Sequence, residues 1–301
     1  MSLPEMVEHT NMEDVPHHTP LRTTQNATGF MIFFSFWIAL SAWICSFDTG
    51  YGGIVLLMPS YNNAFGVCHT VPNGTGAMIE KCHVAATQQS LISLTSLFIA
   101  LGGALSAPVG HYLGRRGTIQ FGCVLVIIGA AGMLGTSGNF TNYMVCKCLG
   151  GVGLGHLYAA SPMYGVECTS PKKRGMLMSL YNIGLAMGNV AALAVCAGSS
   201  NIQNDWAWKT PIICQIPLAV IFAIGIMIFP ESPPWLLTKG KEEKARKSFG
   251  KFYQKDPNSD EITAQIREVQ SYIEFEKPPA PLHLGRRSSA ETTSAERSPL
   301  L

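Results

Sequence analysis

The chain has 301 residues, of which 47% are hydrophobic and only 13% are charged. Soluble domains carry about 25% charged residues, so this composition argues against one or two soluble globular domains. The formal net charge of +2 is too small to indicate nucleic acid as a partner. Polar residues gather at 1–25 and 238–301, and the region between alternates long apolar runs with short polar loops, which is typical of a multi-pass membrane protein.

Six apolar runs are long enough to cross a bilayer, because a spanning helix needs about 20 apolar residues. They fall at residues 30–52, 87–110, 117–137, 141–163, 175–198 and 209–229. Membrane β-strands would be about 10 residues long with alternating polarity, a pattern that these runs lack. The sequence therefore predicts an all-α membrane protein whose six transmembrane helices form one bundle over 29–237, after a disordered cytoplasmic tail at 1–28.

Basic residues in the loops predict the orientation of this bundle. Arg115 and Arg116 follow the second run, basic residues at 172–174 follow the fourth, and a further group begins at Lys239 after the sixth. The loops on the other side contain few Lys or Arg residues. By the positive-inside rule, both termini are expected in the cytoplasm.

The loop of residues 60–86 is expected on the side opposite the termini. It contains Cys68 and Cys82, and in an oxidising compartment these cysteines either form a disulfide or remain two unpaired thiols. The sequence leaves both alternatives open. The same loop contains the sequon Asn73-Gly74-Thr75, which makes Asn73 a candidate glycosylation site.

Glycines gather in the fourth and fifth runs. Gly150, Gly153 and Gly155 lie close together in the fourth, and Gly184 and Gly188 form a small-xxx-small pair in the fifth. In lipid, close backbone approach is a main source of helix packing energy. These residues therefore predict tightly packed helices, a structural role that does not by itself indicate transport.

Two charged residues fall inside the apolar runs. Asp48 lies near the end of the first run and Lys147 lies in the fourth. An ionised group in hydrocarbon costs several kcal/mol, so such groups usually face a cavity or a partner. We hypothesise that Asp48 and Lys147 face each other across the bundle, where a carboxylate that is alternately wet and dry can bind and release a proton. The alternative is that Asp48 lies at the interface and only caps a helix near water.

The segment after the sixth run changes character. Ile262, Ile266, Val269 and Ile273 recur at helical spacing among charged residues, which predicts a cytoplasmic amphipathic helical region over 238–276. Residues 277–301 are rich in Pro, Ser, Thr, Arg and Glu and are expected to be a disordered tail.

Six motifs occur in a fixed order between the predicted spans. They are Phe47-Asp48-Thr49-Gly50, Leu113-Gly114-Arg115-Arg116, the stretch Lys147 to Gly155, Pro162-x-Tyr164-x-x-Glu167-x-x-x-Pro171-x-x-Arg174-Gly175, Trp208-Lys209 and Pro230-Glu231-Ser232-Pro233. Over about residues 30–275, the chain in this way resembles the sugar porters of the major facilitator superfamily, in their fungal form. The resemblance implies the amino-terminal half of a fold in which two six-helix bundles rock around a central site.

The resemblance also implies a function. In proton-coupled members of the family, the acidic residue that matches Asp48 takes the proton and the basic residue that matches Lys147 responds to it. The implied activity is transport of a sugar or polyol by alternating access, coupled to protons, in a lipid bilayer that is expected to be the plasma membrane. It requires no cofactor and no metal.

A charge network is implied for the cytoplasmic end of the bundle. Arg115, Arg116, Glu167, Arg174 and Glu231 match family positions that latch the outward-facing state. Such a latch needs charges on different helices that pair in one state and separate in the other.

Several residues depart from the family pattern. Asn182 stands where the family commonly has a sugar-binding Gln, and its amide offers the same donors and acceptor on a shorter arm. Lys147 replaces an Arg and loses bidentate geometry. His111 replaces an Asp of the second-to-third loop, and Pro234 replaces an Arg after the last Ser-Pro.

The family has twelve spans, whereas six are predicted here, and two functions remain open. The chain is either a half-length transporter that works with a copy of itself or with a second half-transporter chain, or a non-transporting membrane protein such as a sugar sensor or an inactive truncated isoform. An enzyme is disfavoured, because the sequence shows no nucleophile with its base, no metal-ligand spacing and no phosphate-binding loop.

Overall fold

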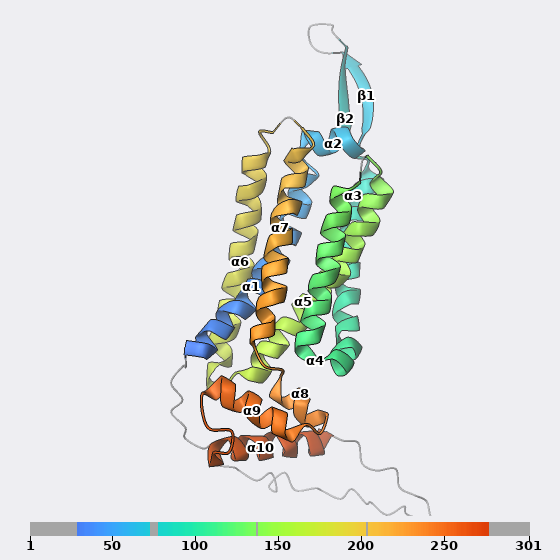
Figure 1. Ribbon diagram of the computed structural model, residues 1–301. Coiled ribbons are helices and arrows are strands. Elements are labelled where there is room, and N and C mark those ends of the chain that lie inside the picture. The colour runs from blue at the N-terminus through green and yellow to red at the C-terminus, as the bar shows by residue number, and fades with distance from the viewer. Residues whose placement is uncertain (1–28, 73–77, 137, 203, 277–301) are drawn as a thin grey trace, which may run out of the picture.

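The computed structural model describes residues 29–72, 78–136, 138–202 and 204–276. The long helices run side by side as one bundle, as Figure 1 shows. A β-hairpin projects beyond one end of the bundle, here called the hairpin end, and three shorter helices lie across the other. The terminal segments 1–28 and 277–301, which the sequence predicts to be disordered tails, lie outside the described residues.

Five long helices build the bundle: α1 (Gly29–Val55), α4 (Thr95–Leu134), α5 (Phe140–Cys168), α6 (Arg174–Ser199) and α7 (Trp206–Gly225). Short 3-10 turns adjoin two of them, η1 (Pro171–Lys173) before α6 and η2 (Ile226–Ile228) after α7. Each of the six predicted spans is therefore largely helical, with most of the second and third in α4 and the start of the second in a shorter preceding helix, α3 (Ala86–Ser93). The prediction of an all-α bundle is confirmed.

Helix α4 contains two passes because its backbone turns at Gly114. Gly114 has φ 81° and ψ 178°, which no helix accommodates. The first leg of α4 runs parallel to α5, since Gly151 meets Thr95 and Gly155 meets Ile99. The second leg runs the opposite way along α5. A straight helix of 40 residues would measure about 60 Å, twice the thickness of the hydrocarbon core. Because the helix turns near its middle, each leg is about half that length and crosses the core once.

Four helical stretches of the described residues are long and apolar enough to cross a membrane, by length and composition alone. They are Gly29–Val55, Gln88–Leu134, Pro171–Ser199 and Trp206–Ile228. Helix α5 is not among them, because Lys147, His156 and its glycines lower its mean hydropathy. It nevertheless lies in the bundle against both legs of α4, and its Lys147 and His156 are buried in protein.

The glycines explain how α5 fits between the two legs of α4. A Cβ on Gly153 would lie 2.6 Å from the carbonyl oxygen of Gly122 on the second leg, and a Cβ on Gly155 would overlap the carbonyl of Ile99 on the first. The predicted small-xxx-small pair acts in the same way, because Gly184 of α6 packs against the Ala39 carbonyl of α1. Backbone contact on this scale supplies the dispersion energy that holds helices together in lipid.

The hairpin end contains structure where the sequence predicts only a loop. Pro59 opens α2 (Pro59–Phe65), and β1 (Val67–Pro72) pairs with β2 (Met78–His83) in antiparallel register before α3 (Ala86–Ser93). Cys68 lies opposite Cys82, and the two form a disulfide. Of the two alternatives that the sequence leaves open, the structure has the bonded one. Asn73 lies outside the described residues.

The opposite end is covered by α8 (Pro233–Thr238), α9 (Glu242–Tyr253) and α10 (Asp260–Glu276). Helices α9 and α10 lie in the segment 238–276, for which an amphipathic helical region is predicted, whereas α8 lies almost entirely before it, in the range predicted as bundle. Phe249 and Tyr253 of α9 pack with Ile262 and Ile266 of α10 against Met31 at the start of α1. Burial among these apolar groups raises the pKa of Tyr253 to about 12. The layer is therefore packed onto the bundle.

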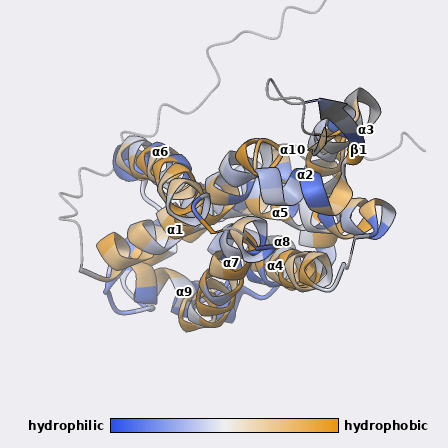
Figure 2. Cartoon of the chain, turned by 90° about the horizontal axis from the view of Figure 1, so that it is seen from above, coloured by the Kyte–Doolittle hydropathy of each residue, from blue (hydrophilic) through white to orange (hydrophobic). Residues whose placement is uncertain are grey.

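The outer faces of the helices expose large apolar side chains. Seen along the bundle, much of α1, α4 and α7 is coloured as hydrophobic (Figure 2). Val145, Val190 and Ile224 are each more than 60% exposed. An exposed surface of this kind would be a liability in water, but it suits contact with lipid or with another apolar bundle.

Candidate functional site

The buried centre of the bundle holds an ion pair. Nζ of Lys147 on α5 lies 2.5 Å from Oδ1 of Asp48 on α1, and each residue is only 5% exposed. The hypothesis that these residues face each other across the bundle agrees with this geometry, whereas interfacial capping by Asp48 does not. The attraction between the two charges offsets the free-energy cost of removing each from water. Either charge buried alone in this environment would be strongly unfavourable.

Tyr51 and Gln215 complete this site. The four residues Asp48, Tyr51, Lys147 and Gln215 are here called the central cluster. The hydroxyl group of Tyr51 lies 2.9 Å from Oδ2 of Asp48 and 3.0 Å from Oε1 of Gln215 on α7. Lys147 lies over the Tyr51 ring, with Nζ 4.6 Å from the ring centroid. The cluster therefore joins three helices through one carboxylate, one ammonium group, one phenol and one amide.

The local sequence explains how the central cluster forms. Tyr51 follows Asp48 by three residues, so both side chains lie on one face of α1. Gly52 lies beside the lysine, where even a Cβ would be in ordinary contact, 3.8 Å from Nζ of Lys147. Chemically, the carboxylate can accept a proton, the ammonium group can stabilise the charged form, and the phenol can donate to it.

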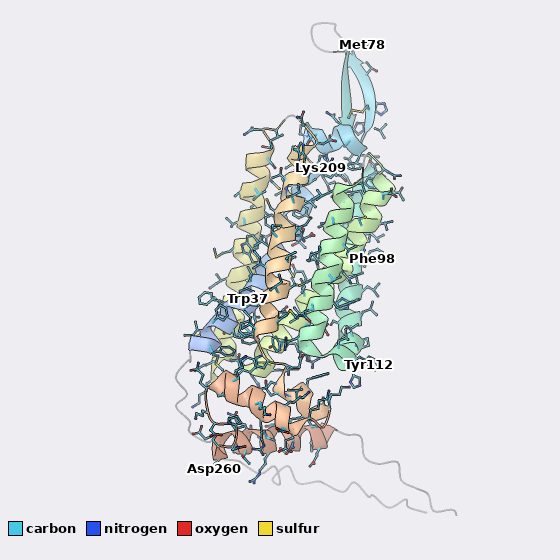
Figure 3. All side chains as sticks on the ribbon, in the orientation of Figure 1. Trp37, Met78, Phe98, Tyr112, Lys209 and Asp260 are labelled. Carbon is cyan, nitrogen blue, oxygen red and sulfur yellow. A yellow bond between two sulfur atoms is a disulfide. The ribbon has the colours of Figure 1, made fainter. Side chains whose placement is uncertain are left out.

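A second polar group, here called the Glu231 cluster, lies where α4 turns: Arg115, Glu167, Glu231 and Ser232. In Figure 3 this end of the bundle carries Tyr112, and Lys209 marks the opposite end. Arg115 Nη2 donates to Oε1 of Glu167 at 2.7 Å, and Nε lies 3.0 Å from both carboxylate oxygens. The Ser232 hydroxyl donates to Oε2 of Glu167 at 2.5 Å. This pair links α4 to α5 and to the segment before α8.

Glu231 forms no ion pair with an arginine side chain among the residues that the structure describes. Its Oε1 accepts the backbone N–H groups of Arg115 at 2.8 Å, Arg116 at 3.2 Å and Ser232 at 3.1 Å. Arg115 and Arg116 begin the second leg of α4, so the carboxylate lies at a helix start whose free N–H groups and dipole favour a negative charge. Glu231 thus acts as a helix cap in this conformation.

Gly114 is required beside Glu231. Its φ of 81° is unfavourable for any residue with a Cβ, and a Cβ there would lie 2.9 Å from Cδ of Glu231. We expect Gly114→Ala to destabilise the protein by about 2–4 kcal/mol, as backbone strain and lost capping add. Thermal unfolding of the purified protein measures this loss. Gly175→Ala is the matched control, since nothing lies within 4 Å of its Cβ position; an equal loss in both variants would contradict the assignment.

The side chains of Arg116 and Arg174, the remaining residues of the expected charge network, lie apart from the ion pair between Arg115 and Glu167. Arg116 donates through Nη2 to the Met227 carbonyl at 3.0 Å. Arg174 is exposed at the start of α6 and forms no ion pair with residues that the structure describes. Asn182 is exposed on α6, next to the buried Tyr181. The structure therefore unites Arg115, Glu167 and Glu231 and leaves Arg174 and Asn182 outside both clusters.

Sequence reasoning missed three residues of the two clusters: Tyr51, Gln215 and Ser232. The signals were present but weak. Tyr51 lies one helical turn after Asp48, Gln215 is a lone amide in an apolar run, and Ser232 precedes a proline at a helix start. Tyr51 and Gln215 are 164 positions apart in the sequence, and Ser232 and Glu167 are 65 apart, so local patterns could not pair them.

Comparison with known proteins supports a defined class for this bundle. The family model described as "Sugar (and other) transporter" matches residues 34–291. The chain is 24% identical over 267 residues to the probable glucose transporter rco-3 of Neurospora crassa, which covers 85% of this chain and 44% of that protein. It is 26% identical over 240 residues to the high-affinity hexose transporter ght4 of Schizosaccharomyces pombe, covering 79% and 42%.

Solved structures show the same fold. The proton:xylose symporter XylE bound to 6-bromo-6-deoxy-D-glucose superposes with a TM-score of 0.69 at 20% identity, covering 83% of this chain and 54% of that one. A partially occluded inward-open conformation of XylE from E. coli gives 0.67 at 20% identity, covering 82% and 60%. The protein is a multi-pass membrane protein, and its described residues have the fold of one six-helix bundle of the major facilitator fold.

The chain belongs to the Sugar (and other) transporter family. The members of this family are transporters rather than enzymes. The chain spans less than half the length of the fungal relatives it matches.

Proposed function

We propose that this bundle serves proton-coupled transport of a sugar or polyol by alternating access, as the amino-terminal half of the transport unit. The observation that carries the proposal is the buried Asp48–Lys147 pair at the centre of a membrane bundle. A buried carboxylate with one cationic partner is neutralised by a single proton, and the partner is then free to move. The similar proteins, a probable glucose transporter, a hexose transporter and a proton:xylose symporter, agree with this chemistry.

The Glu231 cluster is the proposed gate. Arg115 and Glu167 link α4 to α5, and Glu231 holds the start of the second leg of α4. Separation of these groups would free the helix ends to move relative to each other. We assign Asn182, which is exposed on α6, to the surface that presents polar groups to a sugar between this bundle and a second one.

The proposed orientation places the α8–α10 end in the cytoplasm and the disulfide-bonded hairpin outside, at the plasma membrane. The basic residues Arg115, Arg116 and Lys239 lie at the α8–α10 end, as the positive-inside rule requires. Glycosylation of Asn73 would be compatible only with this orientation. A glycosidase-sensitive mobility shift that disappears in Asn73→Gln checks it, and a cysteine placed at position 73 that labels only after permeabilisation would contradict it.

Transport by the chain alone is the direct test. Vesicles containing only this protein should accumulate labelled hexose against its gradient when a proton gradient is imposed, and should not do so when the gradient is collapsed. Empty vesicles provide the background. Correctly inserted protein without accumulation would favour the second candidate, a non-transporting sensor or inactive isoform, and addition of a separately expressed carboxy-terminal bundle would then test whether a second chain is needed.

A further inference from the structure

The hydroxyl group of Tyr51 faces two acceptors but has one proton. It lies 2.9 Å from Oδ2 of Asp48 and 3.0 Å from Oε1 of Gln215. A phenol can donate only one hydrogen bond at a time. While Asp48 is ionised, donation to the carboxylate prevails because hydrogen bonds to a charged acceptor are about twice as strong as neutral ones.

We propose that Tyr51 is a hydroxyl switch and that Gln215 is its second acceptor. When Asp48 binds a proton on Oδ2, the new carboxylic O–H donates to the phenol oxygen, and the phenol O–H turns to Oε1 of Gln215. Tyr51 keeps its own proton throughout, so the only proton gained is the one on Asp48. This inference rests on the proposed protonation of Asp48 and extends it by naming the residue on another helix that responds.

The geometry lets the switch turn without movement of the ring. Tyr51 is fully buried and Gln215 is 1% exposed. The ring is held edge-on to Phe47, with centroids 5.7 Å apart, and lies beneath Nζ of Lys147. Both acceptors are already within hydrogen-bond distance, so rotation of one hydroxyl group is sufficient.

The charged and titratable groups around the phenol come from three helices. Asp48 shares α1 with Tyr51, Lys147 and Tyr143 come from α5, and Cys196 comes from α6. Lys147 Nζ also lies 3.4 Å from the phenol oxygen and can donate to it in either state. Tyr51 therefore has the donors and acceptors that both protonation states of Asp48 require.

Gln215 gives this switch an output on another helix. Its Nε2 has no hydrogen-bond partner within the described part of the chain, although it is buried. Among the described residues, the Gln215 side chain is hydrogen-bonded through Oε1 alone, and the strength of that bond changes with the protonation of Asp48. Protonation on α1 thus alters the hydrogen bonding of α7, 164 residues away in sequence.

Infrared difference spectroscopy between low and high pH tests the switch on the full chain in lipid vesicles. The spectrum should contain a carboxyl C=O band that is absent in Asp48→Asn, and a shifted side-chain amide C=O band that is absent in Gln215→Met. Tyr51→Phe keeps the ring and should retain the carboxyl band but lose the amide shift. Tyr164→Phe is the matched control and should retain both, since its hydroxyl group bonds the Pro230 carbonyl outside the central cluster.

The outcomes separate this inference from the proposed function. An amide shift that persists in Tyr51→Phe, or is missing from the wild type beside a clear carboxyl band, overturns the switch and leaves proton binding intact. A missing carboxyl band overturns both. If Tyr51→Phe does not fold, the tyrosine C–O–H band of the wild type decides, since it must shift with the same midpoint as the carboxyl band. Failure of sugar accumulation affects none of these readouts.

Discussion

Vesicles containing Asp48→Asn are expected to lose uphill sugar accumulation completely, so that the internal sugar concentration only equals the external one. The amide of Asn matches the shape of the carboxyl group but neither binds nor releases a proton at physiological pH. Without a proton on residue 48, the proton gradient has no means of driving the sugar. Exchange of labelled for unlabelled sugar should continue, because exchange requires no net proton movement.

Asp205→Asn is the matched control for this experiment. Asp205 is the residue before α7, its side chain is 63% exposed, and it lies 3.8 Å from Lys209. A surface pair of this kind contributes little, so the variant should accumulate sugar like the wild type. Uphill accumulation by Asp48→Asn at the wild-type level would refute the proton role, and loss of exchange as well would indicate a damaged site rather than lost coupling.

Lys147→Met is expected to have the largest effect on stability, a loss of about 3–5 kcal/mol at neutral pH, because it leaves the buried Asp48 without its cation. Met has a similar volume and fills the same space, so the loss reflects the unpaired charge rather than a cavity. Reversible unfolding in mixed detergent micelles measures the free energy. Lys209→Met, in the first turn of α7, is the control and should change it by less than about 1 kcal/mol, because its ionic partner is the exposed Asp205 at 3.8 Å.

The double variant Asp48→Asn/Lys147→Met separates charge from packing. Removing both members of a buried pair is often nearly neutral, because both desolvation costs disappear together. We therefore expect the double variant to recover most of the stability that Lys147→Met loses. If the two losses simply add, the pair does not interact as its 2.5 Å separation implies.

The same pair shows how far sequence reasoning reaches. A charge within an apolar run is visible in the sequence, and two opposite charges within one bundle suggest each other as partners. The spans were predictable for a similar reason, since about 20 apolar residues in a row are a local property of the chain. Even α5, with its lowered hydropathy, was recognisable from the length of its apolar run and from the basic residues at 172–174 that follow it.

The class of the protein, its six spans and the candidate ion pair can therefore be read from the amino-acid sequence. The residues that complete the pair, and the contacts of Glu231, follow from the three-dimensional packing of the helices. Tyr51 meets Gln215 across 164 residues, and the Glu231 carboxylate meets the Arg115 backbone across 116. Such contacts depend on how α1, α4 and α7 cross, which is set by glycine contacts and by the turn at Gly114. No local pattern encodes those crossings, because they arise from the packing of the whole bundle.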